Sequence, residues 1–285
     1  MSGAGHEPRD VTAQAQKPGS DVGPRVRSAM ILIPLTLAAL FLGHIWFALA
    51  VAVAFAGAYR EWDMMVTGEP LRLPGLILVG LIGLGAIAYV PGGVVAALAL
   101  FAVAAVFAVV LGGKARWWRA AGVLFIALVT CAILEIRDDG QAGIVAGLFL
   151  GISVWGTDSA AFFTGRQVGG AKMSPDISPS KTWSGAIGGL MIGTLAALVI
   201  WIFGTSSPWW IGALLGAAVS ISGQIGDLAE SALKRRFRIK DSGDIIPGHG
   251  GLMDRLDSLT FAILICFAIG TLHQFGMPGE GFVNW

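Results

Sequence analysis

Long apolar runs separated by short polar stretches dominate the chain. The first run extends from Ala29 to about Tyr59, which is long enough for two membrane-spanning segments with a hinge at Gly43-His44. Each segment is close to the ~20 residues that a helix needs to cross a hydrocarbon core about 30 Å thick. Seven further apolar segments cover roughly residues 74–90, 93–111, 120–136, 141–163, 185–204, 208–232 and 256–275. The pattern therefore predicts about nine spans.

Helices are the expected structure of these spans, because a segment exposed to lipid must satisfy its backbone hydrogen bonds internally. We therefore expect an all-α, polytopic integral membrane bundle. The two segments around Pro91-Gly92-Gly93 could instead form one irregular element. The polar residues 1–24 are expected to be a disordered tail rather than a cleaved signal peptide. The rest divides into amino-terminal spans at 25–140 and a carboxyl-terminal catalytic region at 141–285.

The distribution of Lys and Arg predicts the orientation, because cytoplasmic loops accumulate these residues. With nine spans and a cytoplasmic amino terminus, only Arg137 of the 19 basic residues lies on the outer side. The other 18 fall at inner ends or loops: Arg9, Lys17, Arg25, Arg27, Arg60, Arg72, Lys114, Arg116, Arg119, Arg166, Lys172, Lys181, Lys234, Arg235, Arg236, Arg238, Lys240 and Arg255.

Composition excludes several classes of protein. The chain is 55% hydrophobic and only 13% charged, against roughly 25% charged residues in soluble domains, so a soluble enzyme is not expected. A net charge of +1 provides no basic field to attract nucleic acid. Cys131 and Cys266 lie inside apolar runs, which argues against a disulfide framework. The 41 glycines would allow close helix packing, including packing in a homodimer.

One polar stripe follows the segment near residue 227. Its members recur every three or four residues, as expected on one face of a helix: Ser220, Gln224, Asp227, Ser231 and Lys234. Asp227 should lie about 10 Å deeper than Lys234, at ~1.5 Å of rise per residue. A buried Asp costs about 2.5 to 3.5 kcal/mol on insertion scales, so it should face a hydrated cavity, a cation or a base. The alternative is a structural salt bridge to Lys234 or Arg235.

Chemistry is also expected in the following loop, which contains the glycine-rich sequence PGHGG at 247–251 and ends in Asp254-Arg255-Leu256-Asp257. A glycine-rich turn before a helix lets backbone N–H groups approach an anion such as phosphate. Asp254 and Asp227 could converge through the loop and supply oxygen ligands to a divalent cation. Mg²⁺ suits so sparse a site, because it binds through one or two carboxylates plus substrate phosphates. The alternative is an ordinary turn followed by a helix cap.

The stretch from Ser231 to Asp257, SALKRRFRIKDSGDIIPGHGGLMDRLD, resembles the signature of the phosphatidate cytidylyltransferases, or CDP-diacylglycerol synthases. The resemblance extends to a second polar loop through Asp158, Gly165-Arg166, Ile177-Ser178-Pro179 and Lys181-Thr182-Trp183. It covers about the last 130 residues well. Ser184 stands where family members commonly have Glu, and Val168 and Gly170 replace the usual aromatic and basic residues.

The resemblance implies that CTP and phosphatidic acid form CDP-diacylglycerol and pyrophosphate with Mg²⁺, in a bacterial inner membrane. Whether a second cation takes part stays open. Asp227 and Asp254 are the expected metal ligands, both from their placement and from their match to the motif. Lys234 and Asp241 complete the expected catalytic set. The expected substrate-binding residues are Asp158, Arg166, Ser178, Lys181, Arg235, His249 and Arg255.

Two other functions are compatible with parts of the pattern. A polyprenol kinase or an archaeal-type CDP-lipid synthase would use the same cation and phosphate chemistry without the full signature. A transporter with broken helices could also bury Asp227. A transporter predicts midplane polar residues in two repeated halves, whereas the charges here gather at one face and no internal repeat is evident.

Overall fold

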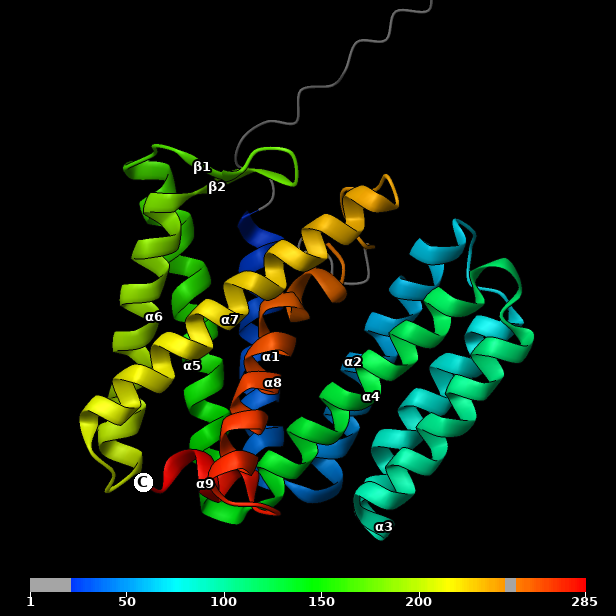
Figure 1. Cartoon of the computed structure of the whole chain (residues 1–285), viewed down its shortest axis with the longest axis horizontal. Coiled ribbons are helices and arrows are strands. Elements are labelled where there is room, and N and C mark those ends of the chain that lie inside the picture. The colour runs from blue at the N-terminus through cyan, green and yellow to red at the C-terminus, as the bar shows by residue number, and fades with distance from the viewer. Residues whose placement is uncertain (1–21, 244–249) are drawn as a thin grey trace, which may run out of the picture.

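The computed structural model describes residues 22–243 and 250–285, with side chains from Met30 onward (Figure 1). Helices make up most of this part of the chain. Their bounds are α1 Val22–Leu42, α2 His44–Thr67, α3 Leu73–Leu111, α4 Arg116–Asp138, α5 Gly140–Gln167, α6 Trp183–Gly204, α7 Trp209–Arg236, α8 Met253–His273 and α9 Pro278–Val283. A 3₁₀ turn covers Gly113–Ala115.

Seven helices of the described region are long and apolar enough to cross a membrane, and Met30–Leu42 in α1 is a shorter apolar stretch. Many large apolar side chains point outward from them, as in α3, where Val95 is 75% exposed and Val110 is 70% exposed. Such extensive apolar surface is typical of contact with lipid rather than water. The expected helical, polytopic membrane protein is confirmed.

Two glycines produce the breaks in the amino-terminal half. Gly43 separates α1 from α2 with a φ of 65°, at the predicted hinge. Gly93 inside α3 has a φ of 63° and non-helical backbone. A methyl group on Gly85 would lie 2.8 Å from the ring of Phe101, although in a straight helix these residues would be about 24 Å apart. The two halves of α3 therefore fold back on each other, as two separate segments were predicted to do.

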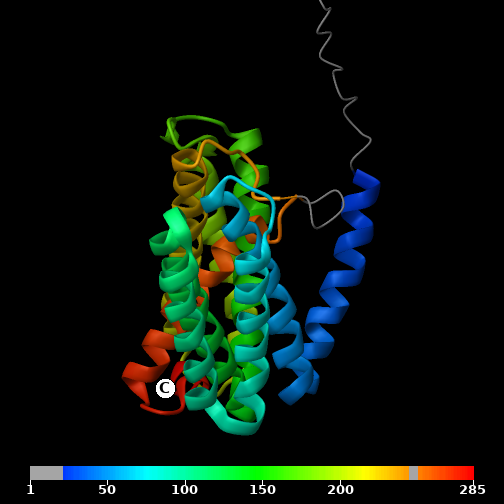
Figure 2. The same ribbon diagram turned by 90° about the vertical axis from the view of Figure 1, so that its right-hand side faces the viewer.

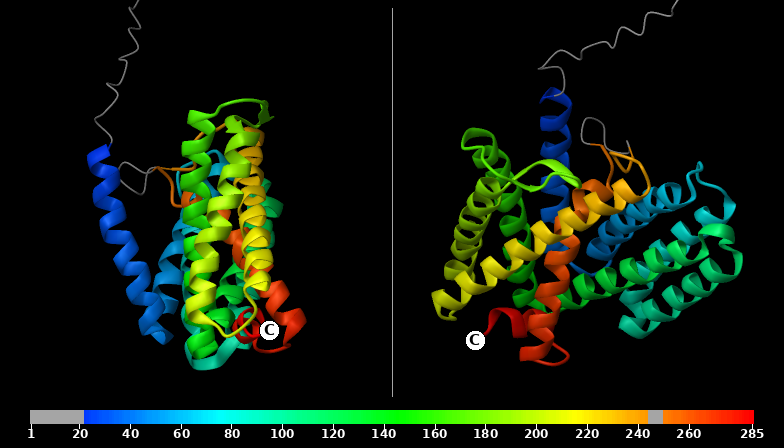
Figure 3. Two further views of the ribbon diagram at one scale, coloured as in Figure 1. Left: turned by 90° about the vertical axis from the view of Figure 1, so that its left-hand side faces the viewer. Right: turned by 45° about the horizontal axis from the view of Figure 1, so that its top comes forward.

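The helices form two groups joined through α8 (Figure 1). Helices α5, α6 and α7 lie on one side and α2, α3 and α4 on the other, while α8 contacts α7 as well as α4 and α2. Helix α1 lies at the edge of the bundle and packs mainly on α2 (Figure 2). The start of α8 and the end of α7 lie at one end of the molecule, and α9 lies at the opposite end (Figure 3).

A short antiparallel hairpin, β1 Lys172–Ser174 and β2 Ser178–Thr182, is the one departure from an all-helical fold in the described region. No strand was predicted there. Pro175 stands in the turn and Pro179 in β2, and the lack of a backbone N–H makes proline unfavourable inside a helix. The hairpin connects α5 to α6 and extends from their ends toward α7 (Figure 1).

Candidate active site

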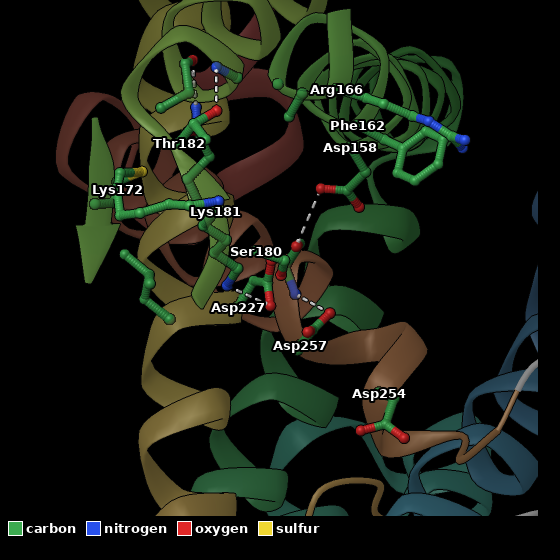
Figure 4. A pocket seen from close by; sticks show the side chains of 18 of the residues that line it. Asp158, Phe162, Arg166, Lys172, Ser180, Lys181, Thr182, Asp227, Asp254 and Asp257 are labelled. Carbon is green, nitrogen blue, oxygen red and sulfur yellow. Dashed lines mark hydrogen bonds and ion pairs between the residues drawn. The ribbon is translucent and has the colours of Figure 1, made fainter. Parts of the chain in front are cut away.

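A cavity of about 660 Å³ opens at the hairpin end of the bundle, between α5, α6, α7, α8 and the two strands (Figure 4). Its lining is rich in charge for a membrane protein. The charged lining residues are Asp158, Arg166, Lys172, Lys181, Asp227, Asp254, Arg255 and Asp257. Six of these, all except Lys172 and Asp257, were predicted as substrate-binding or metal-binding residues. They come from separate segments of the chain, and the fold brings them to one cavity.

Three carboxylates gather in the centre of this cavity: Asp158 of α5, Asp227 of α7 and Asp257 of α8 (Figure 4). The charge of Asp227 acts on both Asp158 and Asp257. Ser258 contacts two of the group, because its hydroxyl donates to Asp158 Oδ1 at 3.4 Å and its backbone N–H donates to Asp257 Oδ1 at 2.7 Å. Three like charges in so small a space favour a bound cation or proton.

Asp227 forms an ion pair with Lys181, with 2.7 Å between Asp227 Oδ1 and Lys181 Nζ. The predicted alternative, a structural bridge from Asp227 to Lys234 or Arg235, is therefore not the arrangement observed. Lys181 comes from β2, which leads directly into α6. Thr182 ends this strand and caps the helix, because its hydroxyl accepts the Gly185 N–H at 3.1 Å. That cap fixes where Lys181 enters the cavity.

Asp254 lies apart from the three central carboxylates, nearer the start of α8 (Figure 4). Lys234 Nζ donates to its Oδ1 at 2.6 Å. Its Oδ2 accepts the backbone N–H groups of Ser242 at 3.1 Å and Gly251 at 3.2 Å. Lys234 also lies 3.5 Å from Glu230 Oε1. The two predicted metal ligands, Asp227 and Asp254, thus line one cavity, but each forms an ion pair with a different lysine.

Asp257 and Glu230 were not among the predicted site residues. Asp257 follows Asp254 by three residues, which places both on one face of α8, and this spacing could have revealed it. Glu230 is only 7% exposed and stands one turn after Asp227 on α7. Its neighbour Lys234 lies one turn further along α7, whereas Asp257 comes from α8, so the contact with Asp257 depends on tertiary packing.

The remaining predicted residues lie around the cavity or beyond it. Ser178 is buried in β2, and the residues of β2 that line the cavity are Ser180, Lys181 and Thr182. Arg235 Nε donates to the Ile177 carbonyl at 3.2 Å, which ties α7 to the hairpin. Asp241 is exposed in the segment after α7. His249 lies outside the described residues.

Ser184 has a structural role at the position where glutamate was expected. Its hydroxyl donates to the Gly169 carbonyl and lies 3.0 Å from the Thr182 hydroxyl. It therefore links the end of α5 to the start of α6. Gly170 has a φ of 101°, a backbone conformation that disfavours any side chain. Val168 is 73% exposed.

The chemistry of the lining fits a hard divalent cation. Carboxylate side chains from α5, α7 and α8 line one cavity, and Mg²⁺ prefers oxygen ligands. Within residues 22–243 and 250–285, no three His, Cys, Asp or Glu side chains are grouped so that they could hold an ion by themselves. Mg²⁺ commonly binds through one or two carboxylates, with water and substrate phosphates as its other ligands.

Comparisons with known proteins identify the family to which the chain belongs. The model of the cytidylyltransferase family matches residues 23–273. The phosphatidate cytidylyltransferase of Brucella suis biovar 1 (strain 1330) is 35% identical over 259 residues, which are 89% of this chain and 94% of that protein.

Shorter matches join the chain to two further bacterial proteins of the same name. The phosphatidate cytidylyltransferase of Bacillus subtilis (strain 168) is 39% identical over 141 residues, 49% of this chain and 52% of that protein. That of Staphylococcus epidermidis (strain ATCC 12228 / FDA PCI 1200) is 40% identical over 142 residues, 50% of this chain and 54% of that protein. With its family model matched over nearly all the described helices, this chain belongs to the cytidylyltransferase family.

Proposed function

We propose that this chain is a phosphatidate cytidylyltransferase, which converts CTP and phosphatidate into CDP-diacylglycerol and pyrophosphate at the cytoplasmic face of the membrane. The relative from Brucella suis carries that name and aligns over 94% of its own length. The observation that supports the proposal most directly is the cavity, because it places carboxylates and basic side chains together at one end of an apolar bundle. A lipid phosphate can reach such a site from the membrane and CTP can reach it from water.

In this reaction an oxygen of the phosphatidate phosphate attacks the α-phosphorus of CTP. A new P–O bond forms, and the bond between the α-phosphorus and its bridging oxygen breaks, so that pyrophosphate leaves with the electron pair. Both reactants are anions, so catalysis depends on cancelling their repulsion and holding the attacking and leaving oxygens in line. No nucleophile from the protein is needed.

The cavity residues are suited to these tasks. Asp227 and Asp257 would hold Mg²⁺ in the centre of the cavity, with Asp254 at its edge as the further candidate ligand, and the cation would supply positive charge to the reacting phosphates. Lys181 lies beside Asp227, so its ammonium group can donate to a phosphate bound at that carboxylate. Arg166 and Arg255 line the same cavity and would bind phosphate oxygens with their guanidinium groups.

The proposed topology has nine crossings with the amino terminus in the cytoplasm. They are α1, α2, the two halves of α3, and α4 to α8. Support comes from the hairpin and the end of α7, which lie at one end of the bundle (Figure 1). Basic residues belong to both, in the cavity lining and in the last turn of α7, and cytoplasmic ends of membrane spans accumulate positive charge. A bacterial inner membrane is the proposed location.

Labelling CTP at two different phosphates tests the activity. The purified protein in detergent would be incubated with phosphatidic acid, Mg²⁺ and CTP that is radiolabelled at either the α- or the γ-phosphate. A cytidylyltransferase transfers the α-label to lipid and releases the γ-label in pyrophosphate. Transfer of the γ-label to lipid would identify a lipid kinase instead, and no transfer from either position would refute both enzymes. Omitting Mg²⁺ should abolish the α-label transfer.

A further inference from the structure

Helix α8 begins without a capping side chain of its own. The residue before it, Leu252, offers no side-chain hydrogen bond to the helix, although the first N–H groups of any helix lack partners within the helix. These groups are bonded instead to Glu61 of α2. Glu61 Oε1 accepts the Leu252 N–H at 2.9 Å and Oε2 accepts the Met253 N–H at 2.8 Å. A carboxylate from a distant helix therefore caps the helix that carries Asp254.

The same carboxylate also holds the chain that precedes the glycine-rich loop. The Ser242 hydroxyl donates to Glu61 Oε2 at 2.9 Å. A methyl group on Gly243 would lie 2.7 Å from Glu61 Oε1, and one on Gly251 would lie 2.7 Å from Oε2. The absence of a side chain at both glycines therefore makes room for the Glu61 carboxylate. Glu61 thus joins the two described segments that flank residues 244–249.

Burial makes this arrangement specific. Glu61 is 1% exposed, and a buried carboxylate is costly unless it is fully hydrogen-bonded. Two backbone N–H groups, one hydroxyl and the positive end of the α8 dipole compensate that cost. Glu61 does not belong to the cavity lining. Any influence on the reaction must therefore pass through the start of α8, where Asp254 directly follows Met253.

We propose that Glu61 is a positioning residue, which holds the start of α8 so that Asp257 stays beside Asp227 and Asp254 stays at the edge of the same cavity. This inference rests on the proposed function, because those carboxylates matter as ligands of the reaction's cation. Asp254 helps from the other side, since its Oδ2 binds Ser242 and Gly251. Without Glu61 the first turn of α8 loses its cap, and the two carboxylates it carries lose their fixed placement.

The test compares Glu61→Ala and Glu61→Gln with two control variants, one at Asp63 in α2 and one at Glu69 just after α2. Glu69→Gln removes an exposed carboxylate paired with Arg72 and serves as the neutral control. Asp63→Asn disrupts the buried pair with Arg119 and serves as a control for general damage to α2. Each protein is measured for hydrogen–deuterium exchange of peptides spanning 250–258, for kcat and KM with CTP, and for the Mg²⁺ concentration that gives half-maximal rate.

We expect Glu61→Ala to speed exchange at the start of α8 and to raise the half-maximal Mg²⁺ concentration by roughly tenfold or more, the usual scale for residues that orient metal ligands. Glu61→Gln should give smaller changes in both the exchange rate and the half-maximal Mg²⁺ concentration, because its amide oxygen still accepts a backbone N–H. Asp63→Asn should lower the melting temperature with an unchanged Mg²⁺ requirement. The inference is overturned if Glu61→Ala shows wild-type exchange and wild-type Mg²⁺ dependence. It is also overturned if Asp63→Asn raises the half-maximal Mg²⁺ concentration as much as Glu61→Ala does.

Ser242→Ala gives a second route if Glu61→Ala does not fold. Ser242→Ala removes one donor to the same carboxylate, so its effect combined with Glu61→Gln should be smaller than the product of the two single effects. Independent, multiplicative effects would count against the inference. The exchange measurement needs no activity. A wild-type protein that fails to transfer the α-label would therefore refute the proposed function, and exchange at α8 would still decide the role of Glu61.

Discussion

At the scale of single residues, Asp227 combines a position on an apolar membrane helix with an accessible carboxylate. Its side chain retains 34% exposure inside the cavity and is bonded to Lys181 at 2.7 Å. Charged groups within a membrane helix usually pair with one another or mark a substrate path. Asp227 meets both descriptions, because its partner is itself a candidate phosphate ligand. Substitutions at the two residues should therefore have different kinetic effects.

Replacing Asp227 with Asn should lower kcat by roughly 100-fold or more, because a cation ligand is lost while the shape of the side chain is kept. The measurement is transfer of the α-label to lipid over a range of Mg²⁺ concentrations. Asp176→Asn is the matched control, since Asp176 is an exposed aspartate in the turn of the hairpin and does not line the cavity. Near-normal rates for Asp227→Asn at all Mg²⁺ concentrations would exclude this residue as a ligand.

Lys181→Met should instead raise the KM for CTP, because it removes a donor to phosphate and leaves the carboxylates in place. A loss of roughly 2 to 3 kcal/mol of binding is typical for a hydrogen bond to a charged group. Steady-state kinetics with varied CTP would measure it. Lys240→Met, at an exposed lysine beyond α7, should leave KM unchanged. An unaltered KM in Lys181→Met would assign this lysine a purely structural pairing with Asp227.

At the scale of elements, the close contact between α5 and α6 builds one wall of the cavity. Glycines on α6 face α5 at very short range, and a methyl group on Gly189 would lie 2.8 Å from the Thr157 carbonyl oxygen. Thr157 in turn donates to the Ser220 hydroxyl of α7 at 2.8 Å. Small residues let membrane helices approach closely enough for such packing and hydrogen bonding.

Gly189→Ala should therefore lower the melting temperature in detergent, because the added methyl group pushes α6 away from α5. Overpacking of this kind typically costs about 1 to 3 kcal/mol. Gly151→Ala on α5 is the matched control, since nothing lies within 4 Å of its added methyl group. That variant should be neutral or stabilising by about 0.5 to 1 kcal/mol, from the helix propensity of alanine. Equal melting temperatures for the two variants would contradict the close contact.

At the scale of the whole molecule, the two ends of the bundle differ in chemistry. One end carries the cavity, the hairpin and the basic end of α7, and the other carries α9 (Figure 1). At the end that carries α9, Asp139 Oδ2 accepts the backbone N–H groups of Gly279 and Glu280 at 2.6 and 3.2 Å. This contact fastens α9 to the turn between α4 and α5.

Single cysteines at the two ends would test the proposed orientation in cells. Lys240→Cys is exposed at the cavity end and Phe275→Cys replaces a side chain that is 92% exposed at the other end. A membrane-impermeant maleimide should label Phe275→Cys in intact cells and Lys240→Cys only after permeabilisation. The native cysteines, Cys131 and Cys266, are buried, and labelling of the unsubstituted protein measures their background reaction with the maleimide. The reverse labelling would place the cavity on the outer face.

The sequence alone was sufficient for the helical membrane fold, for the breaks at Gly43 and Gly93 and for the family. These features depend on local properties, namely the length of an apolar run, the backbone freedom of glycine and a contiguous motif. It also located the polar loops that supply the cavity. Each of these properties can be recognised within one contiguous segment, no longer than the 27 residues from Ser231 to Asp257.

Only the tertiary structure decided the partners within the site. It paired Asp227 with Lys181 rather than with Lys234, brought Asp257 beside Asp227, and placed Glu61 against the start of α8. These choices join residues that lie tens to almost 200 positions apart. They depend on how rigid helices stack and on which buried polar groups then lack partners, and no pattern along a single segment contains that information.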